Sequence, residues 1–146
     1  MRPTPEAGNS RILVVEDDPL MLELICTRLT LAGYVTIHGR DGCEGLERLR
    51  DARPDAMLLD INMPRLDGFE VLRRMRVLGH LPRLPVMVLT AHKRTSDVQD
   101  ALELGARDFL TKPFDETRLL ARVARLIRAS AAPRPAPATP RPPRLI

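Results

Sequence analysis

The side chains in this sequence that could do chemistry are three carboxylates, one hydroxyl and one ammonium, each close to the end of a short apolar run. They are Glu16, Asp17, Asp60, Thr90 and Lys112. Clustered carboxylates repel one another unless a cation lies between them, and a hard divalent cation such as Mg²⁺ takes oxygen ligands of this kind. A hydroxyl and an ammonium favour an anion beside that cation, and a carboxylate can be the nucleophile that accepts a phosphoryl group. The set therefore indicates aspartyl-phosphate chemistry, with Asp60 as the candidate acceptor.

Alternating elements along residues 11–129 would have to bring these side chains together, because they are far apart in the sequence. Short apolar runs predict strands, and segments with apolar residues at helical spacing predict helices between them. The predicted strands are 12–15, 34–38, 56–60, 86–90 and 107–110. The predicted helices are 19–32, 41–51, 67–78, 95–104 and 114–129. Pro19 marks the start of the first helix, and Asp41 is the expected cap of the second.

Strands that are each followed by a helix form βαβ units, which build a parallel sheet with helices on both faces. The right-handed crossover rule restricts the topology to a doubly wound α/β fold, and five strands suit the flavodoxin-like order 2-1-3-4-5. Ligands of such sheets bind outside the carboxyl ends of the strands. Glu16, Asp60, Thr90 and Lys112 follow strands that are neighbours in this order, so one site is predicted at this edge.

Each of these residues also has an ordinary structural interpretation. Glu16, Asp17 or Asp18 could simply cap the helix that follows the first strand. Lys112 could be a loop residue before a proline, and Thr90 an unremarked strand end. The occurrence of all of them in one β/α framework favours a site over coincidence.

The chain has 146 residues and a net charge of +4, but its basic character lies mostly in a proline-rich end. Residues 130–146 hold three arginines, no acid and six of the 14 prolines, which predicts a disordered tail or linker; residues 1–10 are also expected to be disordered. The remaining domain, 11–129, is nearly neutral, which makes direct nucleic-acid binding by this chain alone a weak hypothesis. No membrane span or secretory signal is evident. Cys26 and Cys43 match neither a zinc spacing nor a disulfide framework, so a cytoplasmic protein is expected.

Four segments carry a family resemblance. They are VVEDDP (14–19), LLDINMPRLDGFEVLRRMR (58–76), VMVLTAH (86–92) and GARDFLTKPF (105–114). In this order and at this spacing they resemble the receiver domain of two-component response regulators, across residues 11–129. The resemblance implies a cytoplasmic phosphorelay module that a sensor histidine kinase or phosphotransfer protein phosphorylates.

The resemblance implies a role for each residue of the acidic site. Asp60 is similar to the aspartate that takes its phosphoryl group from a kinase phosphohistidine. Glu16 and Asp17 resemble the acidic pair, with Asp17 as a direct Mg²⁺ ligand and Glu16 acting through water. Asn62 matches the position whose backbone carbonyl completes the ligand set, and Mn²⁺ is an alternative cation.

The same resemblance implies the residues that sense the phosphoryl group. Lys112 is similar to the lysine that pairs with a phosphoryl oxygen, and Thr90 to the hydroxyl that moves to bond another. Ala91 matches a small residue that leaves room for the group. Phe109 corresponds to the switch aromatic but lacks the hydroxyl of the tyrosine that many relatives carry, and Lys112-Pro113 resembles the family's cis peptide.

Charged residues on the last two predicted helices suggest an interaction surface. Charges of opposite sign flank the last predicted strand, with acids before and on it and arginines after it: Asp97, Asp100, Asp108, Arg118 and Arg122. Solvated helix faces would look the same. The segment LLARVARLIR (119–128), however, resembles the last helix of receivers from winged-helix transcription regulators, which pair two-fold through this surface. A patch that holds both signs can be self-complementary, so we predict weak dimerisation strengthened by phosphorylation, with Arg122 paired to Asp108 or Asp100 of the other subunit.

Other functions make different demands on the sequence. An aspartyl-phosphate phosphohydrolase would usually need a second acid two residues after the nucleophile, where this chain has Asn62. A phosphorylation-independent interaction module would lack Asp60, Lys112 or the acidic pair, and all are present. We therefore expect a phosphoryl acceptor and not an enzyme that turns over an external substrate. A receiver fragment of a longer DNA-binding transcription regulator stays open, because the residues after 129 are too few for an effector domain.

Overall fold

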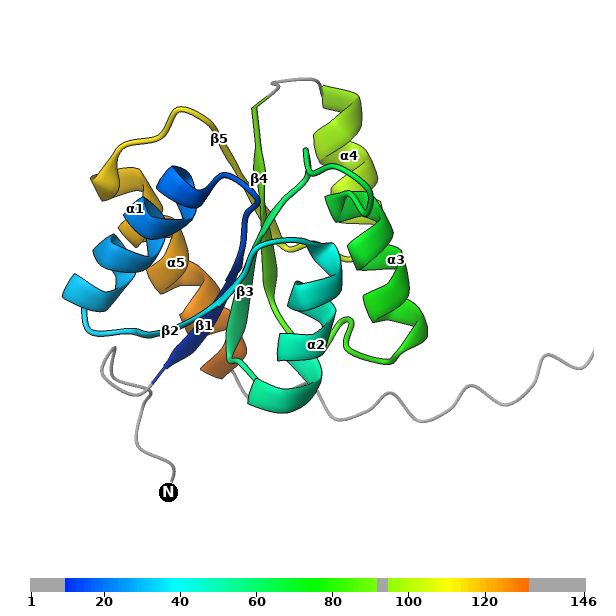
Figure 1. The fold of residues 1–146 in the computed structure, drawn as a ribbon, viewed down its shortest axis with the longest axis horizontal. Coiled ribbons are helices and arrows are strands. Elements are labelled where there is room, and N and C mark those ends of the chain that lie inside the picture. The colour runs from blue at the N-terminus through cyan, green and yellow to red at the C-terminus, as the bar shows by residue number, and fades with distance from the viewer. Residues whose placement is uncertain (1–9, 92–94, 132–146) are drawn as a thin grey trace, which may run out of the picture.

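A parallel sheet forms the centre of the molecule (Figure 1). Its strands are β1 (Arg11–Val15), β2 (Val35–Gly39), β3 (Ala56–Asp60), β4 (Val86–Thr90) and β5 (Asp108–Thr111). Their order is β2-β1-β3-β4-β5 with every neighbouring pair parallel, which confirms the doubly wound, flavodoxin-like fold. This computed structural model describes residues 10–91 and 95–131, so most of the two segments expected to be disordered, 1–10 and 130–146, lies outside the described residues. Residues 130 and 131, predicted to begin the disordered tail, continue α5 instead.

Helices cover both faces of the sheet because the central strands are apolar on both sides. The helices are α1 (Pro19–Leu31), α2 (Gly42–Ala52), α3 (Gly68–Val77), α4 (Thr95–Glu103) and α5 (Glu116–Ala131). α1 and α5 pack on one face, against Ile12, Val14 and Leu58, and the other three pack on the opposite face (Figure 1). No helix in the part of the chain that the structure describes has the length and hydrophobicity needed to span a membrane.

Aspartate side chains cap the starts of helices in this fold. Asp18, Asp41, Asp67 and Asp115 each accept a hydrogen bond from a backbone N–H two or three residues further on. The cap at Asp41 confirms the sequence prediction. The cap at Asp115, whose Oδ1 lies 2.7 Å from the nitrogen of Arg118, explains why α5 begins at Glu116 and not two residues earlier as predicted.

Two strands are shifted by one residue from their predicted positions, β2 and β5. The N–H of Tyr34 donates to the carbonyl of Leu29 at 3.0 Å, so it belongs to the end of α1 and the ladder starts at Val35. The N–H of Val35 donates to the carbonyl of Ser10 at 2.9 Å. Ser10, predicted to be disordered, is therefore part of the ordered domain, and it is buried.

Candidate functional site at the carboxyl edge of the sheet

The candidate residues meet at the carboxyl edge of the sheet, the upper edge in Figure 1, because the strands are parallel. Glu16 and Asp17 follow β1, while Asp60 and Thr90 are the last residues of β3 and β4. Lys112 follows β5, and its N–H donates to the carbonyl of Thr90 at 2.7 Å. The structure thus brings all five residues to one end of the fold, as the sequence predicted.

Three carboxylates form a tight cluster at this edge. Glu16, Asp17 and Asp60 each place one carboxylate oxygen within 4.8 Å of the others, and this is the group of acids in the described residues that could hold a metal ion. Glu16 and Asp60 are buried, with 1% and 2% of their surface exposed, whereas Asp17 is exposed. The Oε2 atom of Glu16 is buried without a hydrogen-bond partner in the described part of the chain. A cation would supply the partner that this oxygen lacks.

The clustering changes the acidity of the first two carboxyl groups. Burial raises the pKa of Glu16 to about 8, with Asp60 adding to the rise and Lys112 opposing it. Burial, together with the nearby Asp60, also raises the pKa of Asp17. Both shifts have the direction expected when acids are gathered close to one another and away from water.

Lys112 supplies part of the missing positive charge. Its Nζ lies 2.8 Å from Oε1 of Glu16 and 3.5 Å from Oδ2 of Asp60. The lysine is thus within reach of both acids, and closer to Glu16. The peptide bond between Lys112 and Pro113 is cis.

The Asp60 carboxylate is held by the backbone of the loop that follows it. Its Oδ1 accepts a hydrogen bond of 3.0 Å from the N–H of Asn62. Because Oδ1 is engaged there, Oδ2 is the oxygen that lies toward Lys112. Asn62 itself is exposed at the surface.

The structure separates the roles of the three consecutive acids after β1. Asp18 caps α1, because its Oδ1 accepts a hydrogen bond of 3.0 Å from the N–H of Leu20. Glu16 and Asp17 are the two that join Asp60 in the carboxylate cluster. Capping thus accounts for one of the three acids, and clustering for the other two.

Thr90 and Phe109, the predicted switch pair, lie on the same face of the sheet. Phe109 is paired with Val88 in the ladder, and Thr90 stands two residues beyond Val88, so all three point toward the layer of α2, α3 and α4. Thr90 is buried and Phe109 is half-buried. Ala91, the predicted small neighbour of the phosphoryl group, is exposed.

The predicted interface residues are placed differently from one another. Arg122 donates to Oδ1 of Asp108 within the same chain at 2.8 Å, because α5 packs beside β5. The pair that we assigned to two subunits is therefore an intrachain ion pair in this structure. Arg118 is exposed and Asp97 is half-buried. Asp100 lies on the side of α4 that faces α3.

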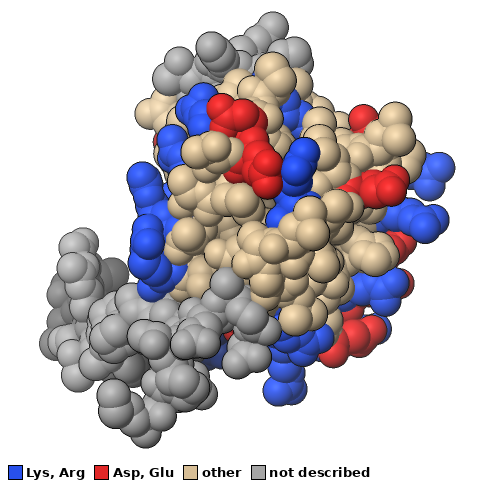
Figure 2. All heavy atoms as spheres, turned by 90° about the vertical axis from the view of Figure 1, so that its left-hand side faces the viewer, with Lys and Arg blue, Asp and Glu red and all other residues tan. Residues whose placement is uncertain are grey.

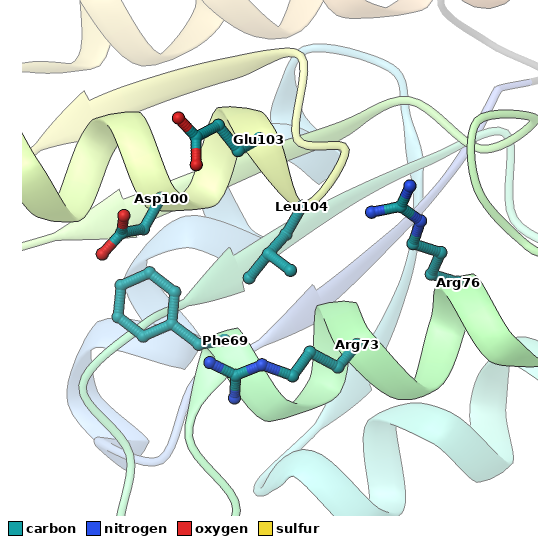
Figure 3. A pocket seen from close by; sticks show the side chains of 6 residues that line it. All are labelled: Phe69, Arg73, Arg76, Asp100, Glu103 and Leu104. Atoms are coloured by element: carbon teal, nitrogen blue, oxygen red, sulfur yellow. The ribbon is translucent and has the colours of Figure 1, made fainter.

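A surface hollow of about 530 Å³ lies between α3 and α4 (Figure 3). Its lining consists of Phe69, Arg73, Arg76, Asp100, Glu103 and Leu104. Arginines line it from α3 and acids from α4, so the lining carries no net charge. None of the clustered carboxylates takes part in it, so the acidic site is not located in this hollow.

Two glycines at helix starts pack against the loop after Asp60, a contact that the sequence does not predict. Gly68 begins α3 and Gly42 begins α2. In the sequence each reads as an ordinary residue after a capping aspartate. Only the three-dimensional packing reveals how closely each approaches the loop.

Comparison with known proteins decides the family of this chain. The family described as "Response regulator receiver domain" matches residues 12–124. The chain belongs to this family. Response regulators are phosphorylated by sensor histidine kinases, and receiver domains bind Mg²⁺ through an acidic pocket.

Two curated relatives match most of this chain but only about half of their own length. Response regulator MprA of Mycobacterium ulcerans is 46% identical over 118 residues, which is 81% of this chain and 50% of that protein. The MprA of Mycobacterium avium is 45% identical and covers 81% of this chain and 51% of its own length. This receiver chain thus spans about half the length of the curated relatives it matches.

Solved structures agree with the fold. Chemotaxis protein CheY4 of Vibrio cholerae superposes with a TM-score of 0.76 at 30% identity and covers 80% of this chain and 98% of its own. The receiver domain of Francisella response regulator 1452 gives a TM-score of 0.77 at 32% identity, over 84% of this chain and 99% of its own.

Proposed function

We propose that this receiver accepts a phosphoryl group on Asp60, with Mg²⁺ bound, from the phosphohistidine of a sensor histidine kinase or phosphotransfer protein. The observation that carries the proposal is the buried Asp60 carboxylate, clustered with Glu16 and Asp17 and with Lys112 3.5 Å away. On this proposal the chain is a signalling acceptor and not an enzyme for an external substrate. A cytoplasmic location goes with such a partner.

The donor set fits a hard divalent cation. The residues that would hold Mg²⁺, or Mn²⁺, are Glu16, Asp17, Asp60 and the backbone carbonyl of Asn62. The fit is supported by the unpartnered Oε2 of Glu16 and by the raised pKa of that carboxyl group. When bound, the cation would neutralise the carboxylates and stabilise the charge on the transferred phosphoryl oxygens.

Phosphoryl transfer would form a bond from Asp60 Oδ2 to phosphorus while the bond from phosphorus to the histidine nitrogen breaks. The N–H of Asn62 holds the other oxygen, Oδ1, and so orients the nucleophile. Lys112 would pair with one phosphoryl oxygen, and the Thr90 hydroxyl would bond another. Movement of Thr90 would then reach Phe109, which lies on the same face of the sheet.

Mass spectrometry of the intact protein tests the acceptor directly. We expect Mg²⁺ with acetyl phosphate to add one phosphoryl group to the wild-type chain, and Asp60→Asn to remove this addition. Asp18→Asn is the matched control, because Asp18 caps α1 and an asparagine also caps well. Lys112→Ala should impair the conformational response to beryllofluoride more than it impairs Mg²⁺ binding. Stoichiometric phosphorylation of the Asp60→Asn variant would show that the acceptor is another residue.

The outer face of α1 is the surface we assign to the phosphodonor. Leu20 is 76% exposed and Leu24 is 47% exposed, and α1 begins two residues after the acidic cluster. Figure 2 looks onto the side of the molecule that carries α1 and α5 and shows a broad uncharged area beside charged side chains. A protein donor must reach Asp60 at this edge, so exposed leucines that border the edge suit its docking.

The second surface of the proposal is the region of α4, β5 and α5, residues 95–129, which would change on phosphorylation. Weak two-fold pairing through this region remains our prediction, with the ion pairs revised. Arg122 and Asp108 already pair within the chain, so a subunit contact would share or exchange this pair. A chain half as long as its relatives is also compatible with the receiver part of a longer DNA-binding regulator, in which this surface would control the remaining half.

A further inference from the structure

The first residue of α3 is packed against the backbone of the proposed acceptor. A Cβ atom at Gly68 would lie 2.7 Å from the carbonyl oxygen of Asp60 and 2.7 Å from the Cα of Ile61. Non-bonded carbon atoms are most stable at about 3.5–4.0 Å, so no side chain fits here unless the backbone moves. The atoms in the way belong to the main chain and cannot rotate aside. Glycine at position 68 thus allows α3 to begin directly behind the acceptor.

A second glycine, Gly42 at the start of α2, packs closely against the same loop. A Cβ atom at Gly42 would lie 2.8 Å from Cδ2 of Leu66, 2.8 Å from Cγ2 of Val71 and 2.9 Å from the carbonyl oxygen of Leu66. Leu66 is buried, with 8% of its surface exposed. The loop 61–67 is therefore enclosed between the starts of α2 and α3.

Hydrogen bonds connect this packing to the acceptor carboxylate. The N–H of Gly68 donates to the carbonyl of Ile61 at 3.0 Å, and so does the N–H of Met63 at 3.2 Å. The N–H of Asn62, the residue between Ile61 and Met63, donates a hydrogen bond to Oδ1 of Asp60 at 3.0 Å. A shift of the peptide between residues 60 and 61 would therefore move both the acceptor and the donor that orients it.

We propose that Gly68 is a positioning residue for phosphoryl transfer, and that Gly42 supports it through Leu66. The start of α3 fixes where the Asp60 carboxylate and the Asn62 backbone carbonyl lie. The inference rests on the proposed function, because it assigns the position of the same acceptor. Gly68 has no side chain to touch the reacting atoms, and it acts through the backbone it contacts.

If the role of Gly68 were purely structural, Gly68→Ala would lower the stability of the fold without a specific effect on Mg²⁺ affinity or phosphorylation rate. Gly79 provides the matched control for this alternative. It has a positive φ of 83°, and a Cβ atom placed there would meet nothing within 4 Å. Gly79→Ala therefore strains the backbone at the far end of α3 without contact with the loop 61–67.

The experiment compares Gly68→Ala, Gly42→Ala and Gly79→Ala in the full chain. Calorimetry measures Mg²⁺ affinity, intact-mass spectrometry measures the initial rate of phosphorylation by acetyl phosphate, and urea unfolding measures stability. For Gly68→Ala we expect about a ten- to hundredfold loss in phosphorylation rate, with a clear loss of Mg²⁺ affinity. Gly42→Ala should lose less, because two of the three atoms it meets are side-chain ends. Gly79→Ala should match the wild type in both site measurements.

The outcomes distinguish this inference from the proposed function. If the wild type is not phosphorylated on Asp60, the proposed function fails, while the Mg²⁺ affinities still decide the positioning role. If Gly68→Ala binds Mg²⁺ and is phosphorylated like the wild type, the inference is overturned and the proposed function stands. If Gly68→Ala does not fold, Gly42→Ala decides: site measurements equal to those of Gly79→Ala overturn the inference, and a specific loss supports it.

Discussion

At the scale of residues, the site was predictable where it depends on strand ends and unpredictable where it depends on side-chain contacts. Asp60 and Lys112 could be located because parallel strands end at one edge. The 2.8 Å contact between Lys112 and Glu16 could not, because strand ends place both residues at the same edge without showing which side chains touch there. Strand ends alone could not separate Asp17 from Asp18, since both follow the same strand; the family resemblance assigned Asp17 to the acidic pair, and a hydrogen bond from the N–H of Leu20 identifies Asp18 as the cap.

The raised pKa of Glu16 predicts how the metal-free protein responds to pH. Between its ordinary value of 4.5 and about 8, the folded state holds a proton that the unfolded state has released. Stability should therefore fall as pH rises through this window, by on the order of 1–3 kcal/mol. Glu16→Gln should flatten this fall, and Mg²⁺ should oppose it in the wild type. Urea unfolding in EDTA at both ends of the window measures the effect; an equal fall in Glu16→Gln would assign it to other groups.

At the scale of elements, order and type followed from periodicity, but boundaries followed from hydrogen bonds that periodicity does not report. α5 begins later than predicted because Asp115 caps it, and β2 begins later than predicted because the N–H of Tyr34 bonds to the carbonyl of Leu29. The close approach of α3 to the end of β3 was equally invisible, because Gly68 in the sequence carries no sign of what it touches. Element contacts of this kind are a property of the assembled layers.

From the exposed leucines of α1 we predict that this helix is needed to recognise a protein donor but not for the phosphoryl-transfer step itself. Leu24→Glu should lower the rate of phosphotransfer from a histidine kinase that phosphorylates the wild type, about tenfold or more, because burying a charge at an interface is costly. The rate with acetyl phosphate should stay unchanged, since Leu24 is not part of the acidic cluster. Leu102→Glu, on α4 and 42% exposed, is the matched control. Equal losses with both donors would place the effect in the site or the fold.

At the scale of the whole molecule, the surface proposed for recognition is α1 alone, whereas the surface proposed for response combines elements of both helical layers. α1 and α5 form one layer, while α3 and α4, which follow Asp60 and Thr90 in the chain, belong to the other. β5 stands at the edge of the sheet next to β4, so α4, β5 and α5 can present a continuous surface that both layers help to build. On the proposed function, a movement of Thr90 would reach this surface through Phe109 of β5, which lies on the same face of the sheet.

This arrangement predicts how charge should affect self-association. Beryllofluoride-loaded protein should form a weak dimer through α4, β5 and α5 that loosens at higher salt, because each exposed ion pair contributes only about 0.2–1 kcal/mol. Arg118→Glu changes an exposed residue and should reduce dimerisation without destabilising the monomer. Arg122→Glu should reduce both, because it also sets a second acid against Asp108, whose side chain is only 14% exposed. Sedimentation at two salt concentrations measures the dimer, with Arg50→Glu on α2 as the control. A strict monomer at high concentration, or a dimer that neither Arg118→Glu nor Arg122→Glu weakens, would refute pairing through this surface.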